Sequence, residues 1–256
     1  MRTALALQVA TFARSLTARL GTVLLVMLPA FFAIGMVAVA RSSSAGGPSG
    51  AKLAPYREGT FSEATASLAG QIVPVVSLIT VGFAISWLVG REWADHTLGS
   101  LFALSETRTS LAWAKVTVAL AWAVACVTLA VGLVGAGSAI FGNGTFTGDV
   151  ATSLVKVWVA GLVMCALAAP FGWVAVRFRG YLGAVGATIA ATAASQILAS
   201  LGVGAWVPYV APALWSGAAG PDAAEAISPV SLLLAIAFAA FGAWAGVRAF
   251  ARARLD

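Results

Sequence analysis

Long apolar runs separated by short polar stretches are the dominant pattern of this chain. A helix of about 20 apolar residues is long enough to cross a hydrocarbon core of about 30 Å. The pattern therefore predicts an all-α integral membrane protein with six transmembrane helices. The predicted spans cover residues 20–40, 68–89, 116–140, 154–176, 182–201 and 229–250.

The first span also has one feature of a secretory signal peptide, because Ala38-Val39-Ala40 resembles a small-residue cleavage site. Its apolar run is longer than the core of about 7–15 residues that a signal peptide usually has. We therefore expect a retained helix.

The N-terminal residues 1–19 have an amphipathic pattern. Arg14 and Arg19 are placed to reach phosphate headgroups, and apolar side chains recur at near-helical spacing. The apolar positions are Leu5, Val9, Phe12 and Leu16. This pattern predicts a helix that lies on the inner leaflet before the chain enters the bilayer.

The segment 202–227, between the last two predicted spans, is too apolar for a solvated loop. It contains Trp206, Tyr209 and Trp215, and such aromatic residues concentrate at the level of the headgroups. We expect it to lie at the outer interface or to dip into it as a re-entrant-like segment. A simple interfacial loop and a functional re-entrant element both fit the pattern.

Composition supports the membrane assignment. Charged residues make up 9% of the chain and hydrophobic residues 61%, against about 25% and about 45–50% in soluble domains. So few charges cannot cover a water-soluble particle of 256 residues, which excludes the class of cytosolic enzymes. The net charge of +6 does not indicate nucleic-acid binding, because the basic residues lie at the ends of the apolar runs.

The distribution of lysine and arginine predicts the orientation. With the N-terminus inside, eleven basic residues fall on the cytoplasmic side and four on the opposite side. The four are Arg41, Lys52, Arg57 and Lys156. Cytoplasmic flanks carry the excess of positive charge in membrane proteins, so we expect both termini in the cytoplasm.

The chain lacks the motifs of common catalytic and cofactor sites. No lysine has the sequence context of a P-loop, so we expect no nucleotide or other cofactor on this chain. The single histidine, His96, and the separate Cys126 and Cys165 do not have metal-ligand spacing. No predicted span contains Asp or Glu, which argues against a lipid hydrolase and against a proton- or sodium-coupled carrier.

The fifth predicted span has a polar face. Thr188, Thr192 and Ser195 share one side of it, and Gln196 lies beside them. These side chains are candidates for lining a substrate pathway. Hydrogen bonding between packed helices is the alternative role for such residues.

The cytoplasmic stretch 90–110 carries the most specific pattern of the chain. Drawn as one helix at 100° per residue, it has an apolar half and a polar half. The apolar half contains Trp93, Thr97, Leu98, Leu101, Phe102 and Leu104, and the polar half contains Glu92, Asp95, His96, Gly99 and Ser100. The pattern predicts an amphipathic helix with one face for lipid or neighbouring helices and the other for the cytosol or a partner.

This stretch resembles the loop between the second and third helices of ABC exporter permeases of the type-2 superfamily, which includes antibiotic, drug and polysaccharide exporters. That loop has an acidic residue, a Thr five positions later, an Arg in a turn and a Lys that opens the third helix. Glu92, Thr97, Arg108 and Lys115 occupy these positions. Two residues depart from the pattern: His96 stands where a glycine is common, and Ser105 where a proline is usual.

The resemblance implies a permease subunit that carries out no covalent chemistry and works with a separate ATP-binding-cassette ATPase, which binds ATP and Mg²⁺. It implies alternating access for a hydrophobic or amphipathic substrate, and a second permease subunit in a homodimer or heterodimer. The residues expected to contact the ATPase are Arg91, Glu92, Asp95, His96, Thr97 and Arg108.

The predicted organisation is a single transmembrane permease domain, residues 1–256, in contact with the lipid of a plasma membrane, which we expect to be bacterial. It contains an interfacial helix at 1–19, a cytoplasmic coupling segment at 90–110 and an outer interfacial segment at 202–227. The alternative function is a membrane scaffold or signalling subunit that binds a cytoplasmic partner without moving substrate.

Overall fold

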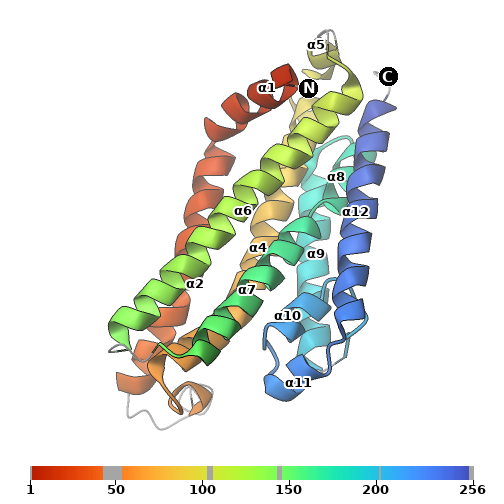
Figure 1. Cartoon of the computed structure of the whole chain (residues 1–256). Helices are drawn as coiled ribbons and strands as arrows, with labels where there is room; N and C mark the ends of the chain where they lie inside the picture. The colour runs from red at the N-terminus through yellow and green to blue at the C-terminus, as the bar shows by residue number, and fades with distance from the viewer. Residues whose placement is uncertain (1, 43–53, 103–105, 143–145, 202, 254–256) are drawn as a thin grey trace.

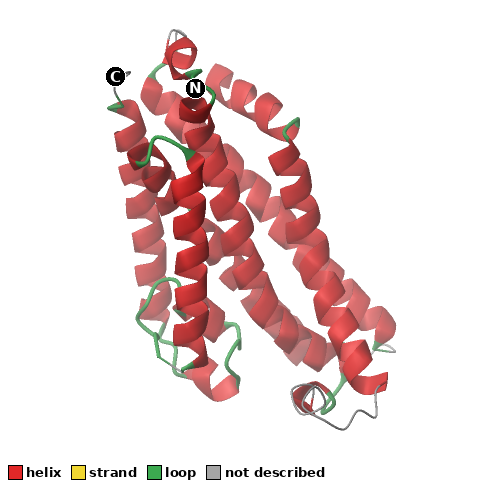
Figure 2. Cartoon of the chain, turned by 180° about the vertical axis from the view of Figure 1, so that it is seen from behind, coloured by secondary structure: helices red, strands yellow, loops and turns green. Residues whose placement is uncertain are grey.

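The computed structural model describes residues 2–42, 54–102, 106–142, 146–201 and 203–253, and these residues form helices, turns and loops without a strand (Figures 1 and 2). Six helical spans in this part of the chain are long and apolar enough to cross a membrane. They are α2 (Leu16–Ser42), α4 (Phe61–Ala94), α6 (Arg108–Phe141), α7 (Gly148–Ala166) with α8 (Pro170–Arg177), α9 (Tyr181–Ser200) and α12 (Pro229–Ala251). The prediction of an all-α protein with six membrane-spanning helices is confirmed.

Shorter elements lie at the two ends of this bundle. They are α1 (Arg2–Ala13), the 3₁₀ turn η1 (Ala54–Tyr56), α5 (Leu98–Phe102), α10 (Ala211–Trp215) and α11 (Pro221–Glu225). Both chain termini and α5 lie at one end, which we call the α5 end, and α10 and α11 lie toward the other, the α10 end (Figure 1).

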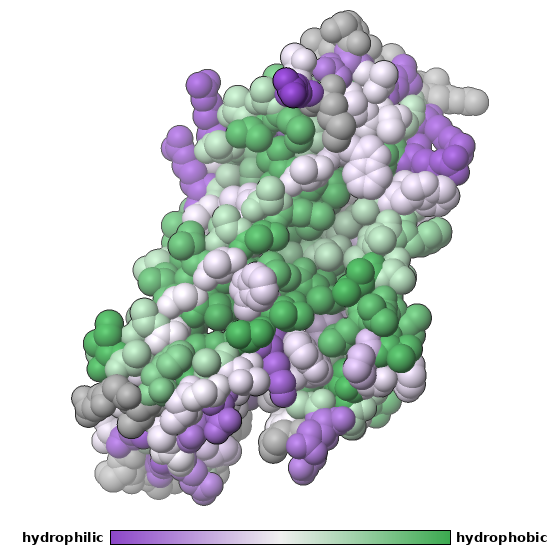
Figure 3. Space-filling model, in the orientation of Figure 1, coloured by the Kyte–Doolittle hydropathy of each residue, from purple (hydrophilic) through white to green (hydrophobic). Residues whose placement is uncertain are grey.

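The surface of the bundle is apolar along its middle and polar at its ends (Figure 3). Large side chains such as Phe31, Leu129, Leu182 and Phe241 are each more than half exposed. Water would disfavour so much exposed apolar surface, whereas the hydrocarbon core of a membrane accepts it. The exposed faces of the spans therefore suit an apolar environment such as the interior of a membrane.

Hydroxyl side chains start several of the spans. Thr60 accepts a hydrogen bond from the Glu63 N–H (3.2 Å), and the Glu63 carboxylate accepts one from the Thr60 N–H (2.9 Å). This capping box satisfies two N–H groups that a helix start leaves without partners. Thr107 and Thr147 cap α6 and α7 in the same way with one bond each. The helices consequently begin in polar sequence, outside the apolar runs.

The fourth span is interrupted at residues 167–169. α7 ends at Ala166, and α8 begins with Pro170 in its first turn. Proline has no N–H to donate and is therefore well placed at a helix start. The sequence predicted one continuous helix here, and the structure shows two.

The interfacial helix predicted at 1–19 is shorter and buries a different face. α1 packs against α6 through Ala4, Gln8 and Phe12, whereas Val9 is half exposed. Leu16 belongs to the next helix, because α1 ends at Ala13 and the Ser15 hydroxyl accepts from the Ala18 N–H (3.1 Å) at the start of α2. Of the four apolar positions predicted for this helix, Phe12 is the one that is fully buried.

The segment between α9 and α12 folds back into the bundle. Residues 211–214 of α10 are buried against α4, α7 and α12. Ser216 Oγ donates to the Gly70 carbonyl of α4 (2.8 Å). The buried part of this segment is the short helix α10, whereas Val203 and Trp206 are more than half exposed. The segment is therefore attached to the bundle through α10. This agrees with the prediction that it is not a solvated loop.

α4 is the most buried span and contacts α2, α6, α7, α8 and α9. Small residues make these contacts close. A Cβ placed on Gly90 would lie 2.5 Å from the Tyr181 backbone nitrogen at the start of α9. Only glycine fits at that point without displacing backbone.

We expect Gly90→Ala to lower the stability of the bundle by about 1–3 kcal/mol, the usual cost of overpacking. Gly132→Ala in α6 is the matched control, because a Cβ there meets nothing within 4 Å, and alanine favours the helix by up to about 1 kcal/mol. The measurement is the unfolding midpoint of both variants in detergent. Equal midpoints would show that the contact at Gly90 is not tight.

Candidate functional site

The candidate site is the α5 end of α4 and the turn that follows it. α4 continues beyond the predicted end of the second span and stops at Ala94. The His96 N–H donates to the Trp93 carbonyl (3.3 Å), and the Thr97 N–H donates to the Glu92 carbonyl (3.0 Å). These two bonds form a Schellman motif, the usual end of a helix whose next residue is left-handed. His96 has φ 53° and occupies that position.

The stretch 90–110 is therefore not one amphipathic helix, and that prediction is wrong. α4 ends before His96, and α5 is a separate helix that begins at Leu98. Leu98 is buried and anchors α5 to the bundle, whereas Asp95, His96 and Thr97 are exposed on the turn. Leu104 and Ser105, which were predicted to belong to this segment, lie outside the described residues.

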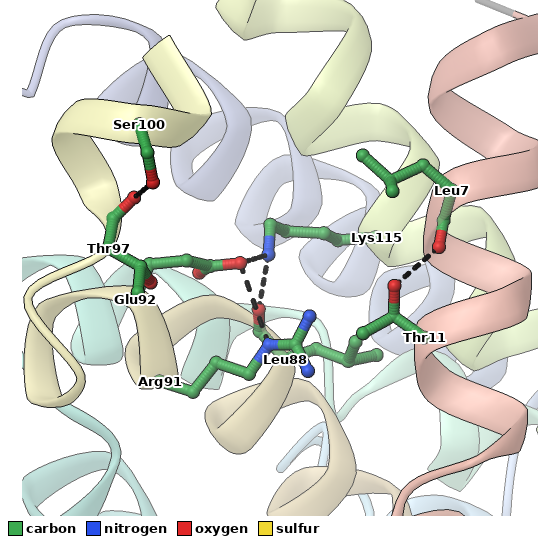
Figure 4. A network of polar contacts seen from close by, with 8 residues as sticks. All are labelled: Leu7, Thr11, Leu88, Arg91, Glu92, Thr97, Ser100 and Lys115. Atoms are coloured by element: carbon green, nitrogen blue, oxygen red, sulfur yellow. Dashed lines mark hydrogen bonds and ion pairs between the residues drawn. The ribbon is translucent and has the colours of Figure 1, made fainter. Parts of the chain in front are cut away.

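Glu92 points into the protein and meets Lys115 of α6 (Figure 4). The exposed fraction is 4% for Glu92 and 1% for Lys115. Lys115 Nζ donates to Glu92 Oε1 and also to the Leu88 carbonyl (2.5 Å). The two charges neutralise each other in a setting that water does not reach.

The net contribution of this ion pair to stability is small, although each partner depends on the other. Removing two charges from water costs several kcal/mol per ion, and their attraction roughly offsets that cost. Loss of one partner alone leaves an uncompensated buried charge. No described residue donates to the second oxygen of Glu92, Oε2, so this carboxylate depends on Lys115 and on its neighbour Arg91, whose Nε lies 3.6 Å from Oε1.

Aromatic contacts extend the pair to the last helix. The Phe250 ring of α12 lies 5.7 Å from Lys115 Nζ and meets Trp93 of α4 edge-on, with ring centroids 5.5 Å apart. Arg108, at the start of α6, donates to the Ala253 carbonyl just beyond α12 (3.1 Å). α4, α6 and α12 are thus joined at the α5 end.

The residues predicted to contact an ATPase fall into two groups. Asp95, His96 and Thr97 lie together on the exposed turn. The other three make contacts within the chain: Arg91 stacks on Trp87 (4.6 Å), Glu92 forms a buried pair with Lys115, and Arg108, which is exposed, bonds to Ala253. In this conformation Glu92 is not accessible to a partner, and it supports the turn from inside.

Sequence reasoning missed the roles of Lys115, Trp93 and Phe250. Lys115 was counted among the cytoplasmic flanking charges, and the structure places it two turns inside α6. An acidic residue and a lysine at the two facing helix ends were a usable signal for an ion pair. Nothing in the sequence pattern connected Phe250 with this region, because α12 is far away in the chain.

The polar face of α9 is packed against α4 in this structure. Thr188, Thr192 and Ser195 are at least 95% buried, and each donates to a carbonyl of its own helix at 2.8–2.9 Å. A Cβ on Gly82 of α4 would collide with the Thr188 side chain. Gln196 lies on the exposed side of α9.

We expect Lys115→Met to lower the stability of the protein by about 3–5 kcal/mol, because methionine keeps the aliphatic length but leaves Glu92 buried without its cation. Glu92→Gln combined with Lys115→Met removes both charges and should recover a large part of that loss. Unfolding midpoints of the wild type, both single variants and the double variant complete the cycle. If the double variant loses as much stability as the two single variants together, the two side chains are not coupled.

Comparison with known families agrees with this architecture. Residues 18–195, more than two-thirds of the chain, match the model of the ABC-2 family transporter protein. A comparison with curated proteins found no matching relative. The matched region includes the first four spans, the exposed turn and both members of the buried ion pair, and it ends within α9. The chain therefore belongs to the ABC-2 transporter family, as a multi-pass membrane permease of the kind that associates with an ATPase subunit.

Proposed function

We propose that this permease exports a hydrophobic or amphipathic substrate by alternating access, and that the turn Asp95–Thr97 with α5 is the surface on which the ATPase docks. The observation that carries the proposal is the exposed turn standing directly on the buried Glu92–Lys115 pair. A polar turn that is attached to this buried ion pair is suited to transmit a movement of the partner to the membrane spans.

The contacts of α4 explain how such a push would spread. α4 joins the turn to α2, α6, α7, α8 and α9, so a displacement of its end displaces helices throughout the bundle. The ion pair and the Trp93–Phe250 contact hold α6 and α12 to that end. Packed helices transmit such displacements because cores are dense and stiff.

The substrate pathway is proposed to form between two permease subunits, identical or different. Within this chain, the hydroxyls of Thr188, Thr192 and Ser195 bond to their own helix and pack on α4. Gln196 and the apolar surface around it on α9 face outward. A second subunit is required to enclose a path along such a surface.

The α5 end is proposed to face the cytoplasm of a bacterial cell, because the positively charged flanks gather there. Cysteines introduced as Ser100→Cys in α5 and Glu58→Cys near the opposite end test this orientation. The native Cys126 and Cys165 are buried, so their background should be low. A membrane-impermeant maleimide applied to intact cells should label Glu58→Cys at once and Ser100→Cys only after permeabilisation; the reverse order would invert the topology.

Charge reversal tests the docking surface. The docking proposal places Asp95 against a basic surface of the ATPase, so Asp95→Arg would bring like charges together at a cost of several kcal/mol. We therefore expect this variant to reduce copurification of the ATPase from native membranes about tenfold or more. Asp222→Arg makes the same change on exposed α11 near the opposite end and should leave copurification unchanged. Mass spectrometry identifies the captured chain, and ATP hydrolysis by the complex confirms that it is active.

The same experiment separates the exporter from the alternative function. A scaffold or signalling subunit would retain a cytoplasmic partner that hydrolyses no ATP. Recovery of such a partner without an ATPase, under conditions that preserve the wild-type complex, would overturn the exporter proposal.

A further inference from the structure

A groove opens between α1, α2 and α6 toward the α5 end of the bundle. Its volume is about 570 Å³, within the range of about 300–1,000 Å³ that ligand sites usually have. Most of its wall is apolar, with Val9 and Phe12 from α1, Ala18 from α2, and Val118 and Trp122 from α6. We call this cavity the α1 groove. It is separate from the turn on which the ATPase is proposed to dock.

Polar atoms in the wall of the α1 groove are largely paired with one another. The Trp122 Nε1–H donates to Thr22 Oγ1 (2.9 Å), and the Thr22 hydroxyl donates to the Ala18 carbonyl (2.7 Å). The Phe12 ring covers Trp122 edge-on at 5.3 Å. An occupant of this groove therefore finds mainly hydrocarbon surface and few free hydrogen-bonding groups. An acyl chain fits that chemistry better than a polar solute does.

The charge beside the groove is positive. Arg19 lines the groove and is exposed, and Arg14 is exposed on the turn between α1 and α2. No acidic residue lines the groove; the acid next to α1 is Glu106, which bonds to Thr3 at the start of that helix. The first turn of α2 also lacks an acid, so its N–H groups add to the positive potential. This combination is complementary to a phosphate-bearing headgroup.

We propose that the α1 groove binds one anionic phospholipid from the leaflet at the α5 end. An acyl chain occupies the apolar groove, and the headgroup phosphate accepts hydrogen bonds from the Arg19 guanidinium. The lipid completes the packing of α1, which touches the bundle through the stripe Ala4, Gln8 and Phe12 and otherwise stands beside the groove.

Fluorescence quenching by brominated lipids tests the proposal, because Trp122 lies in the groove wall. The full chain is reconstituted in phosphatidylcholine vesicles that contain brominated phosphatidylglycerol or brominated phosphatidylcholine at equal mole fraction. The chain has nine tryptophans, so the signal of Trp122 is the difference between the wild type and Trp122→Phe. We expect the anionic lipid to be preferred at Trp122 by about fivefold, the effect of one arginine near an anionic headgroup.

Arginine variants show whether the preference comes from this site. Arg19→Gln should abolish the headgroup preference, and Arg19→Lys should keep most of it. Arg2→Gln is the matched control, since Arg2 is an exposed charge of α1 that does not line the groove. Unfolding midpoints of all variants confirm that they are folded. Native mass spectrometry of retained phosphatidylglycerol gives a second reading that does not require Trp122→Phe.

Three results would overturn the proposal. Equal quenching by both brominated lipids would mean contact with bulk lipid only. A preference that survives in Arg19→Gln would place the anionic lipid elsewhere. Absence of Trp122 quenching by either lipid, together with no retained phosphatidylglycerol, would indicate that protein, such as a helix of a second subunit, fills the α1 groove.

Discussion

The arrangement of the α5 end depends on the contact between Glu92 and Lys115. Neither charge can be buried alone without a large cost in free energy, so each requires the other at one position. This requirement fixes α4 and α6 relative to each other at their facing ends. Well-packed apolar side chains could hold the two helices together as strongly, but they would not require each other at one position in this way. The pair therefore sets the register of these helices.

This register has consequences for the helices around it. Lys115 also lies against Phe250, and Phe250 packs on Trp93, one residue beyond Glu92. The last helix is thus held by the same cluster that holds the second and third spans. The turn Asp95–Thr97 follows this cluster directly, and its backbone N–H groups bond to the carbonyls of Glu92 and Trp93. A force on the turn acts on a joined group of helices rather than on a free loop.

Hydrophobic patterning predicted the number and order of the spans because the length of an apolar run is a strong constraint in lipid. It predicted the ends less well. α4 runs from Phe61 to Ala94, several residues beyond the apolar run 68–89 in both directions. Its ends are set by the Thr60 cap and by the motif at His96, which hydropathy does not detect. Leu16 was assigned to the wrong helix for a similar reason, because Ser15 separates α1 from α2.

The candidate site was predictable in part. The exposure of Asp95 and His96 agrees with the polar half that the sequence suggested, whereas Thr97, which was placed on the apolar half, is also exposed. The inward direction of the Glu92 side chain was not predicted. The sequence analysis placed Glu92 on the polar half because it assumed one continuous helix through residues 90–110. The break occurs at a non-glycine residue in the left-handed region, a conformation that is uncommon and that sequence patterns rarely reveal. The cluster with Phe250 depends on tertiary packing between segments far apart in the chain.

The sequence argued against a proton- or sodium-coupled carrier because the predicted spans lack acidic residues. The extension of α4 in the structure changes that argument. The predicted spans contained no acid, but the second span as observed includes Glu92. A carboxylate that carries protons must alternate between its charged and neutral forms, and it needs a route to water. Glu92 is nearly inaccessible, and its neutralisation would leave Lys115 buried beside a carbonyl and an aromatic ring without a counter-ion. The two side chains are therefore suited to a fixed contact between α4 and α6. Energy for movement would then have to enter from outside the chain, which is the role that the proposed function gives to the ATPase.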